Sequence, residues 1–352
     1  MNETLLFINV FIFIITLVSL ILPYKYQVNA FTLLSASVLC YFSAQTFMVI
    51  TGLSLVVFLL CKQKMILASY AAIALTLGLF ITIQTQLNQL NVAVIGAIYM
   101  VCRQIHYIVE SKKNHFTAIT LWQYLRYQLF IPCLVAGPIH RIDHFEKQLR
   151  RRHFQWQQLS DGLELLLIGH FKVIVIGLFI EKILLESLPV HISAGLALSL
   201  IVSLTQFFKL YILFSGYTDI AKGFAKLLGI EIPDNFNKPL SSVNISDFWQ
   251  RWHITLSNWC KDYVFTPAFA SSRSLLVATI LSMIIIGLWH EFSWRYVLWG
   301  VYHGMGIFIF RWYSSRVSYN LPKLLATSLT ILFVASSYEI TYNLNNWLKT
   351  II

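Results

Sequence analysis

Three histidines in the second half of the chain lie in apolar and aromatic surroundings. His253 lies in FWQRWHITLSNW, His290 follows the apolar run IIIGLW, and His303 lies in the short segment YHG. Ionisable side chains at membrane depth are costly and usually serve a function. A histidine directly after IIIGLW has little water around it, and burial favours the neutral imidazole that a general base needs. We therefore expect acid–base chemistry at His290, with His253 as the second candidate.

Each of these histidines also has a structural interpretation. His253 would then be a hydrogen-bonding residue in a crowded polar core, and His290 would cap the end of a helix. His303 has Gly300 and Gly304 beside it. Because small residues let helices approach closely, packing is the better interpretation of His303.

The segment around His253 predicts an amphipathic helix with an aromatic stripe. Residues spaced by three or four fall on one face of a helix, and here they are Phe248, Trp249, Trp252, Leu256 and Trp259. Arg251 and Asp262 fall outside that stripe. Such a helix suits a membrane interface.

Other kinds of active site find little support in the sequence. It has no HExxH and no paired-ligand spacing, Asp247 and Asp262 follow no ligand pattern, and no GxSxG is present. The five cysteines are scattered, without a CxxC pair. We expect no bound metal, no bound cofactor and no disulfide framework.

The composition indicates an integral membrane protein. Of the 352 residues, 57% are hydrophobic and only 12% are charged, whereas soluble domains carry about 25% charged residues. The net charge of +11 falls mostly in short segments, which indicates cytoplasmic loops facing anionic lipid and not nucleic-acid binding. His140, His144 and His153 lie in one such basic segment, and we expect them to be solvated. We interpret the apolar run from Leu5 as a retained first helix, because no basic residue precedes it.

A spanning helix needs roughly 20 apolar residues. The candidate spans are residues 4–24, 30–44, 46–61, 65–84, 91–109, 162–182, 193–214, 274–290, 294–313 and 323–341. The run 28–61 predicts either one long tilted helix or two short helices meeting near Ser43–Thr46. Residues 117–139 and 240–267 are aromatic but interrupted, and we expect them to be re-entrant or half-buried. The basic segment from Arg141 to Arg152 should be cytoplasmic.

Four blocks, in order between Val135 and Gly304, resemble the membrane-bound O-acyltransferase family. They are VAGPIHRIDHFEKQL, FSGYTDIAKGFAKLLGI, NFNKPLSSVNISDFWQRWHITLSNWCKDYVF and GLWHEFSWRYVLWGVYHG. The third is similar to a signature of the bacterial branch that holds D-alanyl transfer proteins for teichoic acid and alginate O-acetyltransferases. Two departures stand out: Glu291 occupies a position where the family usually has Gly, and TPAFASSRS stands where the alginate type usually has a Gly-Gly-Asn-Arg run. The segments NFNKP and VIGAIYMVCRQIHYIVE look closer to the D-alanyl type.

The resemblance implies an all-α polytopic fold, in which a ring of helices surrounds a thinned centre with a tunnel. It implies His290 as the catalytic histidine and His253 as the second one. It further implies a cytoplasmic thioester donor, either a phosphopantetheinyl carrier protein or acyl-coenzyme A. Residues expected near this donor are Asn235, Arg251, Trp252 and Lys261, although Arg251 and Lys261 equally suit lipid headgroups.

The function that follows is transfer of a D-alanyl or acetyl group to a hydroxyl of an extracytoplasmic envelope polymer or an intermediary. We expect one membrane domain over 1–352, with peripheral helices in 1–110, a catalytic core in 117–313 and a C-terminal helix in 314–352. An acyl carrier protein, an accessory transfer protein and membrane lipid are the expected partners, in a bacterial cytoplasmic membrane. The rival interpretation is a transporter or proton-coupled ion pathway, against which the absence of an inverted repeat counts.

Overall fold

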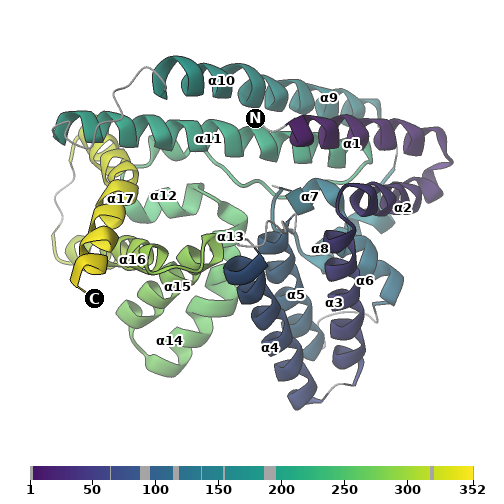
Figure 1. Ribbon diagram of the computed structural model, residues 1–352, viewed down its shortest axis with the longest axis horizontal. Coiled ribbons are helices and arrows are strands. Elements are labelled where there is room, and N and C mark those ends of the chain that lie inside the picture. Colours follow the sequence, from purple (N-terminus) through teal and green to yellow (C-terminus); the bar gives the residue numbers. More distant parts are fainter. Residues whose placement is uncertain are drawn as a thin grey trace. The chain divides into compact units, whose positions relative to one another are not determined.

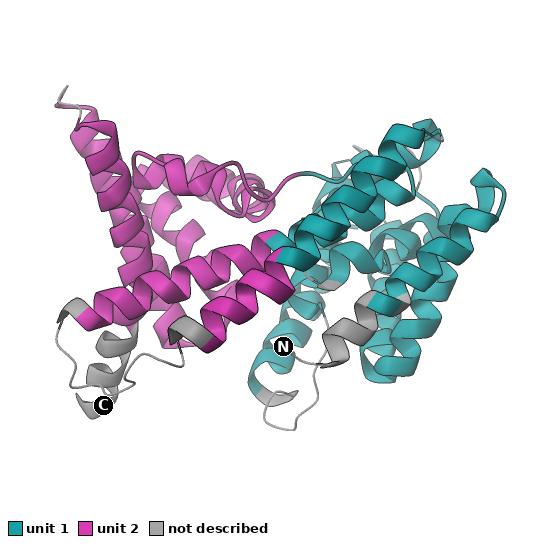
Figure 2. Ribbon diagram, turned by 90° about the horizontal axis from the view of Figure 1, so that it is seen from above, with its two compact units in different colours: residues 1–171, 216–233 teal, residues 172–215, 234–352 magenta. Residues whose placement is uncertain are grey.

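The computed structural model describes residues 3–63, 65–87, 96–113, 119–135, 137–153, 155–185, 196–317 and 321–351. Every regular element within these ranges is helical, which confirms the predicted all-α class (Figure 1). The chain divides into two compact units, coloured separately in Figure 2. Unit 1 comprises residues 1–171 and 216–233, and unit 2 comprises residues 172–215 and 234–352.

Unit 1 is built of consecutive helices that pack on their neighbours in the sequence. They are α1 (Glu3–Ile21), α2 (Tyr24–Phe42), α3 (Ala44–Lys62), α4 (Ile66–Thr82), η1 (Ile83–Leu87), α5 (Ala97–Lys112), α6 (Leu121–Gln128), α7 (Ile131–Val135), α8 (Ile142–Arg151) and α9 (Trp156–His170). The run 28–61 therefore forms two helices. They meet at Ser43, whose side chain accepts a hydrogen bond from the Thr46 backbone N–H at 3.2 Å and so begins α3.

Unit 2 contains the segments that the sequence links to chemistry. Its elements, together with η2 and α11 at the unit boundary, are η2 (Phe171–Ile176), α10 (Gly177–Phe179), η3 (Ile180–Leu185), α11 (Leu196–Leu227), η4 (Pro239–Ser241), α12 (Ile245–Arg251), α13 (Ile254–Cys260), η5 (Lys261–Phe265), α14 (Thr266–Ser272), α15 (Leu275–His290), α16 (Trp294–Ser314) and α17 (Lys323–Ile351).

Several helices are long and apolar enough to cross a bilayer. Within the described residues, five meet this condition by length and composition: Ala44–Lys62, Ile66–Thr85, Trp156–Lys182, Leu198–Leu227 and Lys323–Thr341. They overlap five of the predicted spans, although Leu198–Leu227 runs well past the predicted end at residue 214. The chain is an all-α polytopic membrane protein. In the predicted interrupted segments 117–139 and 240–267, the described residues form short helices.

The basic segment after Pro138 contains helix α8, and one histidine of the segment departs from the expectation. Residues of α8 were expected to form a solvated loop. His144 and His153 are exposed as predicted, but His140 is only 2% exposed and packs against the rings of Tyr127 and Phe145. The Tyr127 hydroxyl donates to the His140 carbonyl at 2.7 Å, which draws this part of the segment inward.

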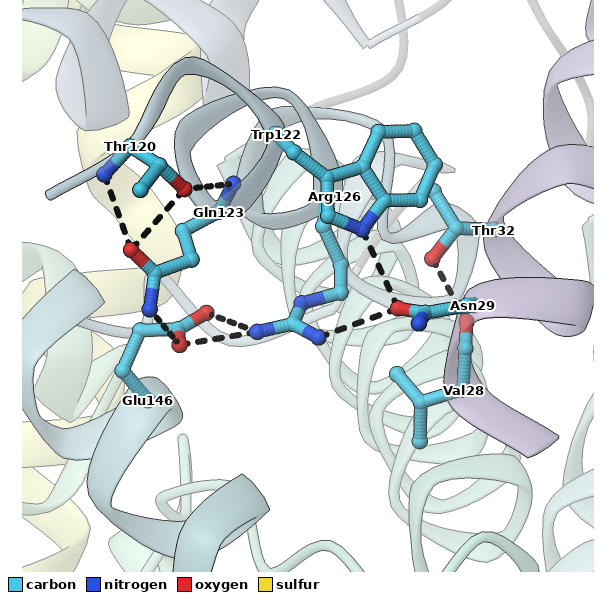
Figure 3. Close-up of polar contacts among 8 residues, drawn as sticks. All are labelled: Val28, Asn29, Thr32, Thr120, Trp122, Gln123, Arg126 and Glu146. Atoms are coloured by element: carbon cyan, nitrogen blue, oxygen red, sulfur yellow. Dashed lines mark hydrogen bonds and ion pairs between the residues drawn. The ribbon is translucent and has the colours of Figure 1, made fainter. Parts of the chain in front are cut away.

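A polar network ties α2, α6 and α8 together inside unit 1 (Figure 3). Arg126 donates to both carboxylate oxygens of Glu146, at 2.7 and 2.8 Å, and Gln123 donates to the same carboxylate at 3.1 Å. Asn29 accepts from Trp122 and from Arg126, both at 3.1 Å. Glu146 is 1% exposed, so its charge is compensated at close range.

Glycines set the close approach of α15 to α16, which lie side by side in unit 2 (Figure 1). A Cβ at Gly300 would stand 2.5 Å from the Cα atom of Ile284, and one at Gly287 would stand 2.2 Å from the Tyr296 carbonyl oxygen. Real Cβ atoms do not approach so closely, so glycine at both positions lets the two backbones touch. This contact fixes the end of α15, where His290 lies.

Candidate functional site

The segment around His253 is not one helix, and the predicted continuous aromatic stripe is wrong. Helix α12 begins at the Asn244 cap, whose side chain accepts from the Asp247 backbone N–H at 2.7 Å, and it ends at Arg251. Trp252 is extended, and His253 has φ 43° and ψ 50°, in the left-handed region. Helix α13 then starts at Ile254. The break divides the predicted helix into two separate short helices.

Backbone contacts from a neighbouring segment hold this break in place. The Asn235 carbonyl accepts from the Ile254 N–H at 3.0 Å, and the Arg251 carbonyl accepts from the Asn237 N–H at 3.0 Å. The Asn235 side chain accepts from the Thr255 hydroxyl at 2.6 Å and is fully buried. Asn235, predicted to lie near the donor, is thus placed as a support for His253.

His253 is buried in an aromatic cluster. Its side chain is 2% exposed, and its ring centroid lies 4.7 Å from that of Phe214 and 5.5 Å from that of Trp289. Within the described part of the chain, neither ring nitrogen has a hydrogen-bond partner. Burial, and next the charge of nearby His290, lower the pKa of His253 well below 6.5. The imidazole is therefore neutral at physiological pH, with both nitrogens unused.

His290 is the last residue of α15, and its side chain is exposed. This exposure has a local cause, because the chain leaves the helix at Glu291 in an extended conformation, with φ −157° and ψ 133°, and the last side chain projects from the helix end. Aromatic rings still surround the imidazole on several sides: Trp289 at 4.8 Å, Tyr296 stacked at 5.9 Å and Trp299 edge-on at 5.9 Å.

One indole connects the two histidines. The ring centroid of Trp289 lies 5.5 Å from that of His253 and 4.8 Å from that of His290. The charge on His290 also acts on the pKa of His253. The structure thus brings together the two histidines that the sequence singled out, although 36 residues separate them along the chain.

His303 has the surroundings of a packing residue. It is fully buried, and its ring contacts those of Trp299 at 4.4 Å, Trp249 at 5.3 Å and Phe333 at 5.8 Å. These contacts join α16 to α12 and α17. The structure agrees with the packing interpretation of the sequence.

A pocket of about 500 Å³ lies between α12, α13, η5, α15 and α16. Its neutral polar lining includes Ser246, Gln250, Ser257, Asn258, Thr279 and Ser282. The cationic side chains of Lys261 and Arg311 line it as well. Met283 and Ile286 contribute apolar surface, and Ile286 lies four residues before His290, on the same face of α15. The pocket wall therefore leads along α15 toward His290.

The four predicted donor residues do not fall together. Lys261 lines the pocket, whereas Arg251 pairs with Asp247, its Nε 2.7 Å from the carboxylate. Trp252 is buried against Phe207, Phe236 and Phe248, with ring centroids 5.1 to 5.5 Å away. The sequence analysis did not single out Arg311 or the hydroxyls of Thr279 and Ser282. Thr279 and Ser282 lie in an apolar run, where their spacing of three residues was the available signal.

No group of three or more His, Cys, Asp or Glu side chains among the described residues is arranged to hold a metal ion.

The comparisons with known proteins bear on the same region. The profile of the membrane-bound O-acyltransferase family matches residues 26–343. A peptidoglycan O-acetyltransferase of Helicobacter pylori is 34% identical over 61% of this chain and 43% of its own length. A teichoic acid D-alanyltransferase of Streptococcus thermophilus is 30% identical over 61% of this chain and 56% of its own length. A probable alginate O-acetylase of Azotobacter vinelandii is 31% identical over 62% of this chain and 44% of its own length.

The chain spans about half the length of these curated relatives. The family profile, however, covers most of the chain, including both histidines, the pocket and the α15–α16 contact. The ordered blocks seen in the sequence lie inside the same range. The chain belongs to the membrane-bound O-acyltransferase family.

Proposed function

We propose that this protein transfers an acyl group from a thioester donor to a hydroxyl of a cell-envelope polymer or an intermediary, in the bacterial cytoplasmic membrane. The observation that carries this proposal is the arrangement in unit 2, where an accessible histidine ends the helix that lines a pocket with apolar, neutral polar and cationic side chains. The names of the relatives support the reaction type, because they describe acetyl and D-alanyl transfer to envelope polymers. They favour transfer over the transporter alternative.

In the proposed reaction, His290 removes the proton from the acceptor hydroxyl. The hydroxyl oxygen attacks the thioester carbonyl carbon, the C–S bond breaks, and the proton passes from His290 to the departing thiolate. General-base catalysis of this kind contributes roughly 10²–10⁴-fold to a rate. The exposed imidazole can reach both reactants, and the rings of Tyr296 and Trp299 orient it.

His253 has a different part in this proposal. Its ring is buried and neutral, so it neither collects protons from solvent nor adds positive charge beside His290. We assign it the role of fixing Trp289, and through that indole the orientation of His290. A neutral neighbour also leaves His290 free to accept a proton, since a second cation there would disfavour it.

The pocket is the proposed site of the donor arm. A phosphopantetheine arm carries a phosphate and two amides, which match Lys261 and Arg311 for the charge and the amide and hydroxyl side chains for the rest. A carrier-protein thioester and an acyl-coenzyme A share this arm. The proposed acyl group is a D-alanyl or acetyl group, and the proposed acceptor is a hydroxyl of the cell envelope.

The test is acyl transfer by the purified full chain. Radiolabelled acetyl-coenzyme A and a D-alanyl carrier protein serve as donors, with lipoteichoic acid and peptidoglycan fragments as acceptors. We expect one of the two donor classes to transfer its label to an acceptor. The transfer rate should fall about 10²–10⁴-fold in His290→Gln, while expression and helix content stay unchanged. Transfer by His290→Gln at more than a tenth of the unsubstituted rate would remove His290 as the base and leave His253 in its place.

A further inference from the structure

A buried guanidinium in unit 1 has an unused edge. Arg103 of α5 is fully buried, and its Nη1 donates to the Tyr127 carbonyl at 3.1 Å. Its Cζ also lies 5.8 Å from the centre of the Tyr127 ring. Within the part of the chain that the structure describes, its Nε and Nη2 atoms have no hydrogen-bond partner. Most of the donors of this side chain are therefore removed from water without an acceptor.

The charge of Arg103 also has no counter-charge among the residues that the structure describes. None of the ion pairs among the described residues includes it. The buried carboxylate of the same unit, Glu146, is bound by Arg126 at 2.7 Å. The acidic groups that act on Arg103 are the thiols of Cys102 and Cys133 and the phenols of Tyr124 and Tyr127. Burial raises the pKa of Cys133 to about 12 and that of Tyr124 well above 10, so these two groups stay protonated.

Arginine cannot relieve this situation by losing its proton, since the guanidinium stays charged in proteins. A buried ion without a partner is costly, and a buried donor without an acceptor adds to that cost. An acceptor of negative charge would remove both penalties together. The neighbouring His140, also buried, does not compete for it as a cation, because burial and next the Arg103 charge lower its pKa well below 6.5.

The geometry of the unused atoms specifies the partner. The Nε–H and Nη2–H bonds lie on one edge of the planar guanidinium and point in parallel. This edge matches two coplanar oxygens of one anion, which accept two parallel hydrogen bonds. The remaining corner is already occupied by the Tyr127 carbonyl.

We propose that Arg103 binds a small oxyanion with two coplanar oxygens, of the carboxylate class, in the interior of unit 1. The anion neutralises the guanidinium and is a structural ligand of the packing between α5 and residues 124–140. The site shares no residue with the histidines or the pocket of unit 2. Tests of the anion site therefore do not depend on the proposed transfer reaction.

The first experiment measures the anion that the protein carries. The purified full chain is desalted in a zwitterionic buffer and denatured with acid, and the released anions are quantified by ion chromatography. We expect close to one equivalent of a small carboxylate such as formate or acetate. Arg103→Met keeps most of the volume but removes the charge, and it should release none.

A second experiment covers an anion that exchanges during purification. Thermal unfolding midpoints are recorded while formate, acetate, phosphate or chloride is added at equal ionic strength. We expect formate or acetate to raise the midpoint by a few degrees, about 3 °C, with saturation, and chloride to have no such effect. Arg103→Lys, which keeps the charge but loses the parallel edge, should lose this preference. Arg151→Gln, at an exposed position of α8, should retain it.

The possible outcomes separate clearly. Stabilisation by phosphate alone would point to a phosphate, free or on a lipid headgroup, and would overturn the carboxylate assignment. Equal midpoints in all four anions, together with no released anion, would show that water satisfies Arg103 and would overturn the site itself. A folded Arg103→Met protein that still responds to acetate would place the anion elsewhere.

Discussion

Two cationic residues of unit 2 have different surroundings, which their residue types alone do not reveal. Arg251 and Lys261 are both cations in one aromatic segment, but Arg251 is held by Asp247 at 2.7 Å, whereas Lys261 lines the pocket with Arg311. Charge that is already paired within a helix contributes little to a ligand. The two cations of the pocket are therefore the ones expected to meet the donor.

We expect Lys261→Gln and Arg311→Gln each to raise the KM for the donor by about five- to tenfold with little change in kcat, because each loses one charge-assisted contact at an exposed position. Steady-state kinetics with varied donor measure this. Arg251→Gln should leave the KM unchanged and lower only the thermal midpoint. A KM effect confined to Arg251→Gln would return the donor phosphate to that residue.

At the scale of elements, the α15–α16 contact depends on the absence of side chains. Gly300→Val places atoms where the Ile284 backbone already lies, at 2.5 Å from the ideal Cβ. We expect a loss of stability of about 1–3 kcal/mol or more, because overpacked atoms force backbone shifts. Transfer activity should fall with it, since the end of α15 carries His290.

The matched control is Gly52→Ala in α3, where a new Cβ meets nothing within 4 Å. That change should stabilise the protein by about 0.5–1 kcal/mol, because alanine loses less conformational freedom in a helix than glycine does. Thermal unfolding in detergent compares the two. Equal stability of Gly300→Val and the unsubstituted chain would mean that the helices can separate without loss.

A second element-scale prediction concerns the network of Figure 3. Glu146→Ala leaves Arg126 without its carboxylate in a largely buried place, and we expect a loss of about 3–5 kcal/mol. The double change Arg126→Met with Glu146→Leu should be much closer to the unsubstituted protein, since no charge remains unpaired. If the double variant were the less stable one, the network would act through its hydrogen bonds and not through charge.

The extent to which sequence predicts these elements depends on where their hydrogen bonds originate. Helices whose bonds are all internal, such as α15, were predicted nearly to the residue, and His290 was placed at the correct end. The break at His253 was missed, because the apolar spacing is helical on both sides of it. Only the distant backbone groups of Asn235 and Asn237 reveal the break. His140 was misjudged for the same reason, since contacts with Tyr127 bury a histidine that its basic neighbours suggest is solvated.

For the whole molecule, the distribution of charge predicts the orientation in the membrane. Five Arg or Lys residues lie between Arg141 and His153, and such short basic segments resist translocation. The candidate span Trp156–Lys182 follows directly. We therefore expect α8 on the cytoplasmic side and Lys182 on the outer side.

Cysteine labelling measures this orientation in a variant that lacks the five native cysteines. His144→Cys and Lys182→Cys both place the thiol at an exposed position. In intact cells, an impermeant maleimide should label only Lys182→Cys, and permeabilised cells should show both. Labelling of His144→Cys in intact cells would reverse the assignment.

The left-handed backbone at His253 has a consequence for how this position changes under selection. With φ at 43°, a residue with a Cβ is strained there, by about 1–2 kcal/mol, whereas glycine is free of that strain and asparagine tolerates it better than most. A codon-randomised library sorted for protein yield should therefore become enriched in glycine and asparagine at position 253. The same library, sorted for modification of the envelope polymer, should keep histidine. Evolution of this chain toward higher expression alone would thus tend to replace His253, one of its two candidate catalytic histidines, first.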